Sequence, residues 1–534
     1  MMPSSQCGTD SADPLAKTPL GFEFPPPGTR HHTLLNSNEV PLDAELDMVK
    51  SVVLKADVDL AGLDDMISKT NAGLGDEMRQ LVEQRASLSS YRARHQAILS
   101  PLRRAPPEIL GEIFFWTLPS PTPRQWRDHD FTTTKSPWIL THVSCYWRAV
   151  AISSPALWSL LPISFITYNT PSYPLDMIET HLARSHKLKI HFYGNEETES
   201  LPQVQIFQCL ARHAFRWEEL SLRMTSALVP LLADVRDRLL ALRRLSLEWD
   251  VPDSETVVDS IDSFQSVPSL VDATVYNMDR YVSIPFPCNQ LTRYQLDAPW
   301  RVHADLLSVS PNLVQAGVTV SFDEEPWPPV GETIQLRRLR QLYLSHSSIL
   351  EYLALPVLDE LTIEVVEGPH GLQPLARSIK RSSSPLRNLY FIGCPDAPSI
   401  CILLQELPSI TALGFIIDDS CTEEQVRDVI ENFTVSESAV VASQLRSLSF
   451  GVHTDELYFS FNYSAYVLMV KSRWESRSCA LTSTTLLAGG EESIDATTLD
   501  GLNALRAEGL DMTLLHGKDA TEAIYLWTFE PTWT

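Results

Sequence analysis

The densest apolar pattern in the chain lies between residues 100 and 161. Large apolar residues recur three and four positions apart directly after Pro106 and Pro107, which predicts a short helix that begins at these prolines. A second set recurs at intervals of four, four and three, and it predicts another helix that ends before Pro155. The first set is Ile109, Leu110, Ile113 and Phe114, widened by Phe115 and Trp116, and the second is Ile139, Val143, Trp147 and Val150. About sixty residues cannot cover this many apolar side chains alone, so we expect something else to cover part of them.

The region before this pattern has a different periodicity. From residue 42 to residue 74, apolar side chains alternate in steps of four and three, which is the a/d seam of a coiled coil. Gly73 and Gly75 disfavour one continuous helix, so residues 41–98 fit either a coiled coil or a helical hairpin. The stripe over residues 42–88 would serve self-association or pack back on the chain. Residues 1–40 show no periodicity and predict a disordered tail.

One apolar pattern repeats after residue 161: an apolar residue, two of any kind, a second apolar residue, one of any kind, and a third. Each instance predicts a short strand, and spacings of about 20 to 29 residues are typical of strands stacked side by side with helices or loops between them. The ten instances are Trp217-Leu220-Leu222, Leu242-Leu245-Leu247, Leu270-Ala273-Val275, Leu291-Tyr294-Leu296, Leu313-Ala316-Val318, Leu339-Leu342-Leu344, Leu358-Leu361-Ile363, Leu386-Leu389-Phe391, Ile410-Leu413-Phe415 and Leu445-Leu448-Phe450.

The segment after the tenth triplet continues to favour strands. Residues 458–470, 479–487 and 523–529 form strand-like runs, and residues 505–514 fit one more repeat. We expect this segment to cap the stack, because an open end would expose apolar surface.

The chain of 534 residues is acidic, with a formal net charge of −25 and a pI near 4.9. This charge disfavours nonspecific binding to nucleic acid or to anionic membranes, because both repel it at long range. The sequence has no apolar run long enough to span a membrane and no signal-peptide pattern, so we expect a cytoplasmic or nuclear protein. The eight cysteines form no C-x-x-C pair, and neither a metal site nor a cofactor is expected.

Three blocks of the sequence resemble the F-box, and in particular the F-box-like domains expanded in mushroom-forming fungi. That family reads roughly L-P-P-E-I-L-x-E-I-F, then V-C-x-x-W-R-x-I-A, then S-T-P-x-L-W. The matching residues are Pro106, Pro107, Glu108, Ile109, Leu110, Glu112, Ile113 and Phe114, then Val143, Trp147, Arg148 and Ala151, then Ser154, Pro155, Leu157 and Trp158. Ala105 stands where the family has leucine, and Ser144 with Cys145 alters the V-C step.

This resemblance implies a function. An F-box-like domain over residues 99–161 would bind a Skp-type adaptor and through it a cullin, as the substrate-recognition subunit of an SCF-type (cullin-RING) ubiquitin ligase. The chain would then carry no catalytic residue, because other subunits transfer ubiquitin. The residues implied in adaptor binding are Pro106, Pro107, Ile109, Leu110, Ile113, Phe114, Val143, Trp147, Pro155, Leu157 and Trp158.

The ten triplets are similar to leucine-rich repeats, although most lack the asparagine or cysteine that the family places after the strand. The expected fold class is therefore α+β or α/β: N-terminal coiled-coil helices, an all-helical F-box, and an irregular leucine-rich-repeat solenoid with short parallel strands and a cap over residues 162–534. Side chains that alternate with the apolar ones would face the concave side and bind an unknown target protein. The candidate target-binding residues are Arg223, Glu248, Tyr276, Arg293, Tyr343 and Tyr390.

Two other functions stay open at this stage. An F-box-like scaffold for protein–protein interaction outside a ligase is favoured by Ala105 in place of leucine. A hydrolase or transferase would need dispersed catalytic residues, because the sequence has no nucleophile elbow, phosphate-binding loop, dinucleotide glycine pattern or H-E-x-x-H motif. We therefore expect a receptor subunit rather than an enzyme.

Overall fold

The computed structural model describes residues 23–69, 75–118, 134–165, 174–323, 326–365, 372–436, 440–453, 457–490 and 494–527. The described residues divide into two compact units, the first ending at Trp158 and the second beginning at Ser159. Leu160 and Leu161 begin the first strand of the second unit, so the predicted end of the small helical domain at residue 161 lies three residues too late.

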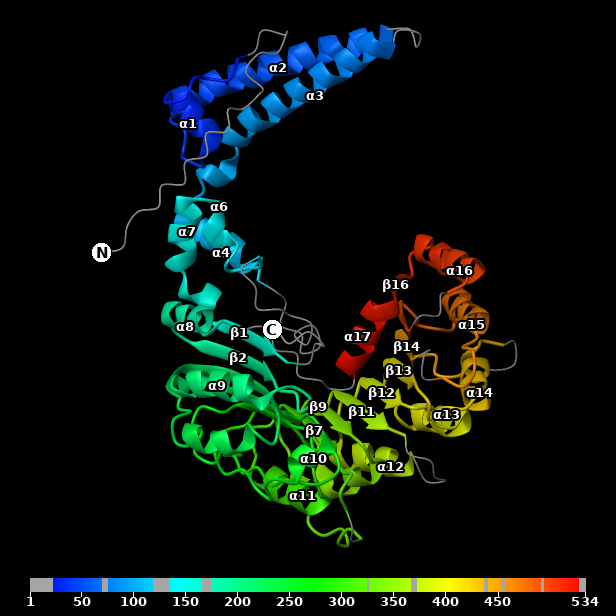
Figure 1. The fold of residues 1–534 in the computed structure, drawn as a ribbon. Helices are drawn as coiled ribbons and strands as arrows, with labels where there is room; N and C mark the ends of the chain where they lie inside the picture. Colours follow the sequence, from blue (N-terminus) through cyan, green and yellow to red (C-terminus); the bar gives the residue numbers. More distant parts are fainter. Residues whose placement is uncertain are drawn as a thin grey trace. The chain divides into compact units, whose positions relative to one another are not determined.

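The N-terminal region of the first unit is a helical hairpin. Helix α2 spans Asp43–Lys69 and helix α3 spans Gly75–Ile98, and the two pack along each other (Figure 1). Seam residues Ala56 and Leu63 are buried against Leu88 of α3. Of the two predicted arrangements the hairpin is the one formed, and part of the seam considered for self-association is used inside the chain.

The end of the predicted disordered tail is folded, which corrects that prediction for residues 23–40. Helix α1 spans Arg30–Asn36, and the Thr29 hydroxyl caps its first turn by accepting from the backbone N–H of His32. Leu34 is fully buried with Val49 and Ile98 of the hairpin. Two adjacent leucines in a polar segment were too weak a pattern to predict this contact.

The described part of the small helical domain, residues 99–118 and 134–158, contains five short helical segments. They are η1 (Pro101–Arg103), α4 (Pro107–Phe115), α6 (Leu140–Val143), α7 (Cys145–Ile152) and η2 (Pro155–Trp158). Helix α4 begins at Pro107, as predicted. The second predicted helix is divided in two, because Ser144 has an extended backbone and its hydroxyl accepts from the Trp147 backbone N–H at 3.1 Å, which caps α7.

The second unit contains a 14-stranded parallel sheet whose strands lie in chain order. The second and third residues of every predicted triplet lie on one of these strands, each triplet on its own strand. The strands are β1 (Leu160–Ser164), β2 (Leu188–Tyr193), β3 (Trp217–Met224), β4 (Arg244–Trp249), β5 (Asp272–Val275), β6 (Arg293–Asp297), β7 (Gln315–Thr319), β9 (Gln341–Leu344), β11 (Glu360–Glu364), β12 (Asn388–Ile392), β13 (Ala412–Ile417), β14 (Ser447–His453), β15 (Ser483–Gly489) and β16 (Asp511–His516). Strands β8 (Ile334–Gln335) and β10 (Leu353–Ala354) pair separately.

Helices and turns connect successive strands. They are α8 (Leu175–Arg184), α9 (Ser200–Ala211), η3 (Ala214–Arg216), η4 (Val229–Val235), α10 (Pro252–Glu255), α11 (Trp300–Ser308), η5 (Ser347–Tyr352), α12 (Gln373–Ser382), α13 (Ala397–Glu406), α14 (Glu423–Phe433), α15 (Tyr463–Glu475), α16 (Ala496–Ala507) and, after β16, α17 (Gly517–Trp527). Strand β15 confirms the run at 479–487, but the runs at 458–470 and 523–529 fall largely on helices α15 and α17. Asn462 caps α15 by accepting from the Ala465 backbone N–H at 3.0 Å.

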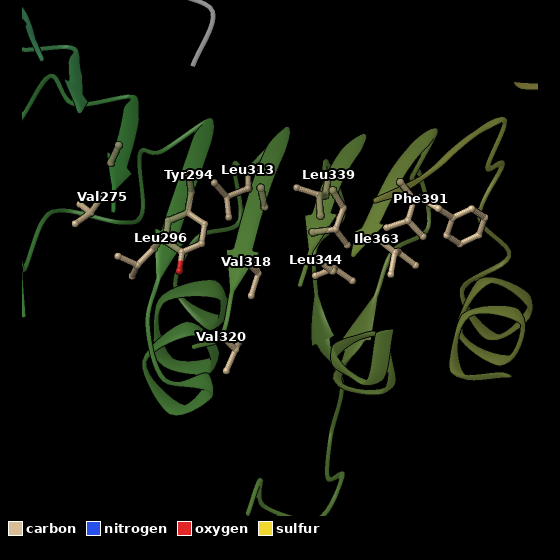
Figure 2. Packing of buried hydrophobic residues seen from close by; sticks show 14 of the residues in the cluster. Val275, Tyr294, Leu296, Leu313, Val318, Val320, Leu339, Leu344, Ile363 and Phe391 are labelled. Carbon is tan, nitrogen blue, oxygen red and sulfur yellow. The ribbon is translucent and has the colours of Figure 1, made fainter. Parts of the chain in front are cut away.

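The triplet residues form the core between the sheet and the helices. Leu222, Leu247 and Val275 are adjacent in the strand register, and the same row continues across the sheet. Figure 2 shows Leu296 and Val318 among the residues that follow one another along this layer. We call the opposite side of the sheet, formed by the strand residues that alternate with these, the open face.

Candidate interaction surfaces

Four of the residues expected to bind an adaptor form the core of the small helical domain. They are Leu110, Phe114, Leu157 and Trp158, each at most 1% exposed. The indole Nε1 of Trp158 donates a hydrogen bond to the Ala151 carbonyl at 2.8 Å. The rings of Phe114 and half-buried Trp147 lie 4.8 Å apart. These side chains hold the helices together and are not on the surface, and Pro155 is also half-buried.

The other predicted residues in this domain are exposed: Pro106, Pro107, Ile109, Ile113 and Val143. Ile109 is 55% exposed and Ile113 is 39% exposed, although both are large and apolar. Trp116 follows three residues after Ile113 and is 83% exposed, so the three residues share one side of α4. We call Ile109, Ile113 and Trp116 the α4 ridge. Phe115, Ile139 and Ile152 are exposed as well.

Trp116 was missing from the residues predicted to bind the adaptor, although the sequence places it on the widened apolar face of the first helix. Its exposure is the signal that the pattern alone could not supply, because a buried and an exposed tryptophan look alike in a sequence. Apolar side chains gathered on the surface of a domain whose core is already filled indicate a binding surface.

Polar contacts join the segment that precedes the hairpin to the small helical domain within the first unit. The guanidinium of Arg103 is buried, which lowers its pKa, and donates to the carbonyls of Leu34 at 3.0 Å and Glu39 at 3.3 Å. The Asn38 side chain donates to the Val143 carbonyl at 3.0 Å. A cavity of about 750 Å³ lies between these segments, and Val143 lies at its wall. Its other lining residues include Arg94, Ala97, Cys145 and Tyr146.

Ala105, which replaces the leucine of the family pattern, lies at the edge of the core. It is half-buried against the core residues, and its carbonyl accepts a hydrogen bond from the Tyr146 hydroxyl at 2.8 Å. The departure from the pattern therefore concerns core packing and not the α4 ridge.

A row of polar residues crosses the open face of the sheet. In strand register from β2 to β12 it consists of Lys189, Glu219, Arg244, Asp272, Arg293, Gln315, Gln341, Glu360 and Asn388. Glu219 accepts from Lys189 at 3.1 Å and from Arg244 at 2.8 Å. The predicted target-binding residue Arg293 pairs with Asp272 at 2.9 Å. The cations of this part of the row are therefore paired within the chain.

A second pairing lies near the carboxyl ends of the same strands. Arg223 is 3.1 Å from Asp250 and 3.8 Å from Glu248. Arg223 and Glu248 were both predicted to bind a target, and they lie opposite each other in the register of β3 and β4. Tyr276, which follows β5, is half-buried. Arg223 and the carboxylates of Glu248 and Asp250 therefore partly neutralise one another.

Carboxylates without such partners occupy the middle of the open face. They are Asp297 on β6 and Glu360 and Glu364 on β11. In the described ranges, no lysine or arginine forms an ion pair with any of the three. Glu360 instead accepts from Gln341 and Asn388, each at 3.4 Å. Asp297 and Glu364 were not predicted; each directly follows the last apolar residue of a triplet, which places it on the open face.

The environment of these carboxylates favours their protonated forms. Burial, together with the nearby carboxylates of Glu364 and Glu255, raises the pKa of Asp297 to about 6. Burial also raises the pKa of Glu364, and the negative charge of Asp418 adds to this. Burial raises the pKa of Glu360 as well. The nearby His346 acts in the opposite direction on Glu364, but within the described ranges no lysine or arginine pairs with these carboxylates.

Two of the predicted tyrosines lie beside these carboxylates. Tyr343 and Tyr390 are on either side of Thr362 in the register of β9, β11 and β12. The Tyr343 hydroxyl donates to Glu364 at 3.1 Å. The ring of Tyr390 lies over Gly414 of β13, where a side-chain Cβ would come within 2.5 Å of the ring. All six predicted target-binding residues are on or beside the open face. Arg223 lies opposite Glu248, and Tyr343 and Tyr390 lie on either side of Thr362, whereas Tyr276 and Arg293 belong to neither pair.

The last strands have an apolar open face, and helix α17 packs on it. Ile416, Leu487, Ala520 and Ile524 form a separate buried cluster. Ile416 and Leu487 belong to the register row that contains Glu364 on β11. In Figure 1, α17 lies on the other side of the sheet from α13–α16. This row therefore changes from polar to apolar where α17 covers it.

No protein-family profile matches the chain, and no curated protein matches it. Within the described ranges, His, Cys, Asp and Glu side chains nowhere gather in a group of three or more suited to a metal ion. No helix of the described chain has both the length and the apolar character that a membrane span requires.

Proposed function

We propose that this chain is a substrate-recognition subunit of an SCF-type ubiquitin ligase. In this proposal the small helical domain is an F-box that binds a Skp-type adaptor, and the second unit is an irregular leucine-rich-repeat solenoid that holds a target protein on its open face. The observation that carries the proposal is the α4 ridge: apolar side chains on a helix that matches the F-box pattern, exposed although the domain already has a filled core.

The strand order supports the second half of the proposal. Ten triplets spaced like leucine-rich repeats lie on ten consecutive strands of one parallel sheet, with helices or turns between them. The chain contributes position and not bond chemistry. Holding a target beside a charged conjugating enzyme raises the effective concentration of its lysines near the thioester.

A pull-down with a purified Skp-type adaptor tests the proposal. We expect full-length protein to retain the adaptor, and the Ile109→Ala, Ile113→Ala double variant to lose it, because each truncated anchor costs roughly 1–2 kcal/mol of binding. Trp147 is less suitable for this test, since it packs on Phe114 and its truncation would disturb the core.

A matched control exists on the hairpin. Leu54 and Val58 of α2 have the same four-residue spacing and are 67% and 66% exposed. The Leu54→Ala, Val58→Ala variant should bind like the native chain. Equal binding by all three proteins, or binding by none, would contradict the proposal, and the second outcome would favour a scaffold that acts outside a ligase.

A further inference from the structure

We propose that the open face between β6 and β12 binds an extended, basic protein segment, whose lysine or arginine side chains are received by Asp297, Glu360 and Glu364 beside Tyr343 and Tyr390. The inference deepens the proposed function, on which it rests for the role of that segment as part of the target.

Charge is distributed unevenly along the open face. From β2 to β6 the cations are already paired, as Arg244 is with Glu219 and Arg293 with Asp272. A partner of either sign would have to break these pairs. From β6 to β12 the described face carries carboxylates, amides, hydroxyls and tyrosines, with no lysine or arginine on these strands after Arg293 at the start of β6. Charge complementarity therefore favours a cationic partner in this section.

Helix α17 covers the open face of the last strands. From β13 to β16 the apolar cluster of Ile416 and Leu487 is occupied by Ala520 and Ile524 of α17. This section is thus already covered by the chain itself. The acidic section lies between a charge-balanced section and a covered one.

A bound cation would relieve the repulsion between the carboxylates of this section. Asp297 and Glu364 repel each other, and Asp418 adds to the negative charge near Glu364. A lysine or arginine side chain between them would remove this repulsion and form charge-assisted hydrogen bonds. Tyr343 and Tyr390 lie on either side of Thr362 in the strand register, and the Tyr343 hydroxyl donates to Glu364 at 3.1 Å, so the two tyrosines border the Glu364 end of this section.

The size of the section fits a short extended segment. The strands β6, β7, β9, β11 and β12 are neighbours in this order. At about 4.8 Å between strands they span roughly 19 Å, which an extended chain covers in about six residues.

The test is fluorescence anisotropy with full-length protein and a labelled peptide of three Gly-Lys-Ser-Arg repeats. A peptide of three Gly-Gln-Ser-Gln repeats is the neutral control. The Asp297→Asn, Glu364→Gln variant is compared with Glu351→Gln, Glu406→Gln, which removes two carboxylates that pair with Arg377 and Lys380 on α12. Both variants change the net charge by the same amount.

We expect the basic peptide to bind, the Asp297→Asn, Glu364→Gln variant to bind it about tenfold more weakly, and the control variant to stay within about twofold of native. Absence of binding to the native chain would overturn the inference. So would equal weakening by both variants, because binding would then follow the overall charge and not this section.

The adaptor pull-down with the same proteins separates this inference from the proposed function. Retained adaptor binding with no peptide binding would overturn the inference alone. Peptide binding with the expected variant effect, but no adaptor binding, would overturn the ligase proposal and leave the basic partner supported.

Discussion

Asp297 illustrates a residue whose charge costs stability. Its carboxylate accepts a hydrogen bond from the Ser321 backbone N–H at 3.2 Å, but partial burial and, to a smaller extent, the nearby Glu364 and Glu255 raise its pKa to about 6. The folded state therefore holds the proton more tightly than the unfolded chain does. Stability from this group is present at low pH and is lost as the pH rises from about 4 to about 6. A charge kept at such a cost is typical of a binding site.

Replacement of this carboxylate should stabilise the protein. A pKa that rises from 3.8 to about 6 corresponds to roughly 3 kcal/mol for a fully buried group, and solvent screening at this half-buried position reduces it to roughly 1–2 kcal/mol. We expect Asp297→Asn to raise the midpoint of urea unfolding at pH 7.5 and to have little effect near pH 4. A destabilised variant at pH 7.5 would show that the ionised carboxylate contributes favourable contacts.

Core and surface residues of the small helical domain should respond differently to truncation. Trp158 is fully buried and hydrogen-bonded to Ala151, so Trp158→Ala should cost about 3–5 kcal/mol of unfolding free energy. Ile113 is exposed, and Ile113→Ala should cost less than about 1 kcal/mol. Urea unfolding followed by circular dichroism measures both. Similar losses for the two variants would place Ile113 in the core and remove the basis of the α4 ridge.

At the scale of elements, α17 covers the side of the last strands that lies opposite to α13–α16 (Figure 1). Gly489 of β15 allows this contact, because a Cβ there would lie 2.8 Å from the Thr521 hydroxyl oxygen. The helix buries Ile524 against Leu487 and Ile416. The apolar end of the open face is thereby removed from solvent.

Truncation inside this contact should destabilise the C-terminal strands. Ile524→Ala should cost about 2–4 kcal/mol, because a fully buried side chain leaves a cavity. Leu468→Ala on α15 is the control, since Leu468 is 64% exposed and should cost less than about 1 kcal/mol. Hydrogen exchange of β15 and β16 measures the difference. Unchanged protection in Ile524→Ala would mean that α17 does not stabilise these strands.

The elements that could be predicted are those with a repeated or capped pattern. The triplets located ten strands, because their apolar pairs all face one core, and Pro107 located the start of α4. Helices α15 and α17 were predicted as strands, because the periodicity of a short apolar run does not by itself distinguish a strand from a helix. The site was predictable in part: Tyr343 and Tyr390 were found as open-face residues. Asp297 and Glu364 were missed because the uneven pairing of charges depends on which strands are neighbours.

At the scale of the whole molecule, the two proposed surfaces belong to different compact units. The α4 ridge lies in the unit that ends at Trp158, and the acidic section of the open face lies in the unit that begins at Ser159. Neither surface shares a residue with the other. We therefore expect adaptor binding and binding of a basic segment to be independent, as a receptor that holds a target while attached to a ligase requires.

The most direct measurement is hydrogen exchange by mass spectrometry of the full chain with and without a purified Skp-type adaptor. We expect slower exchange in α4 and in the α6–α7 segment, and no change in the strands from β6 to β12. No protection in α4, with protein and adaptor at concentrations well above a micromolar dissociation constant, would contradict the central proposal that this domain is an F-box.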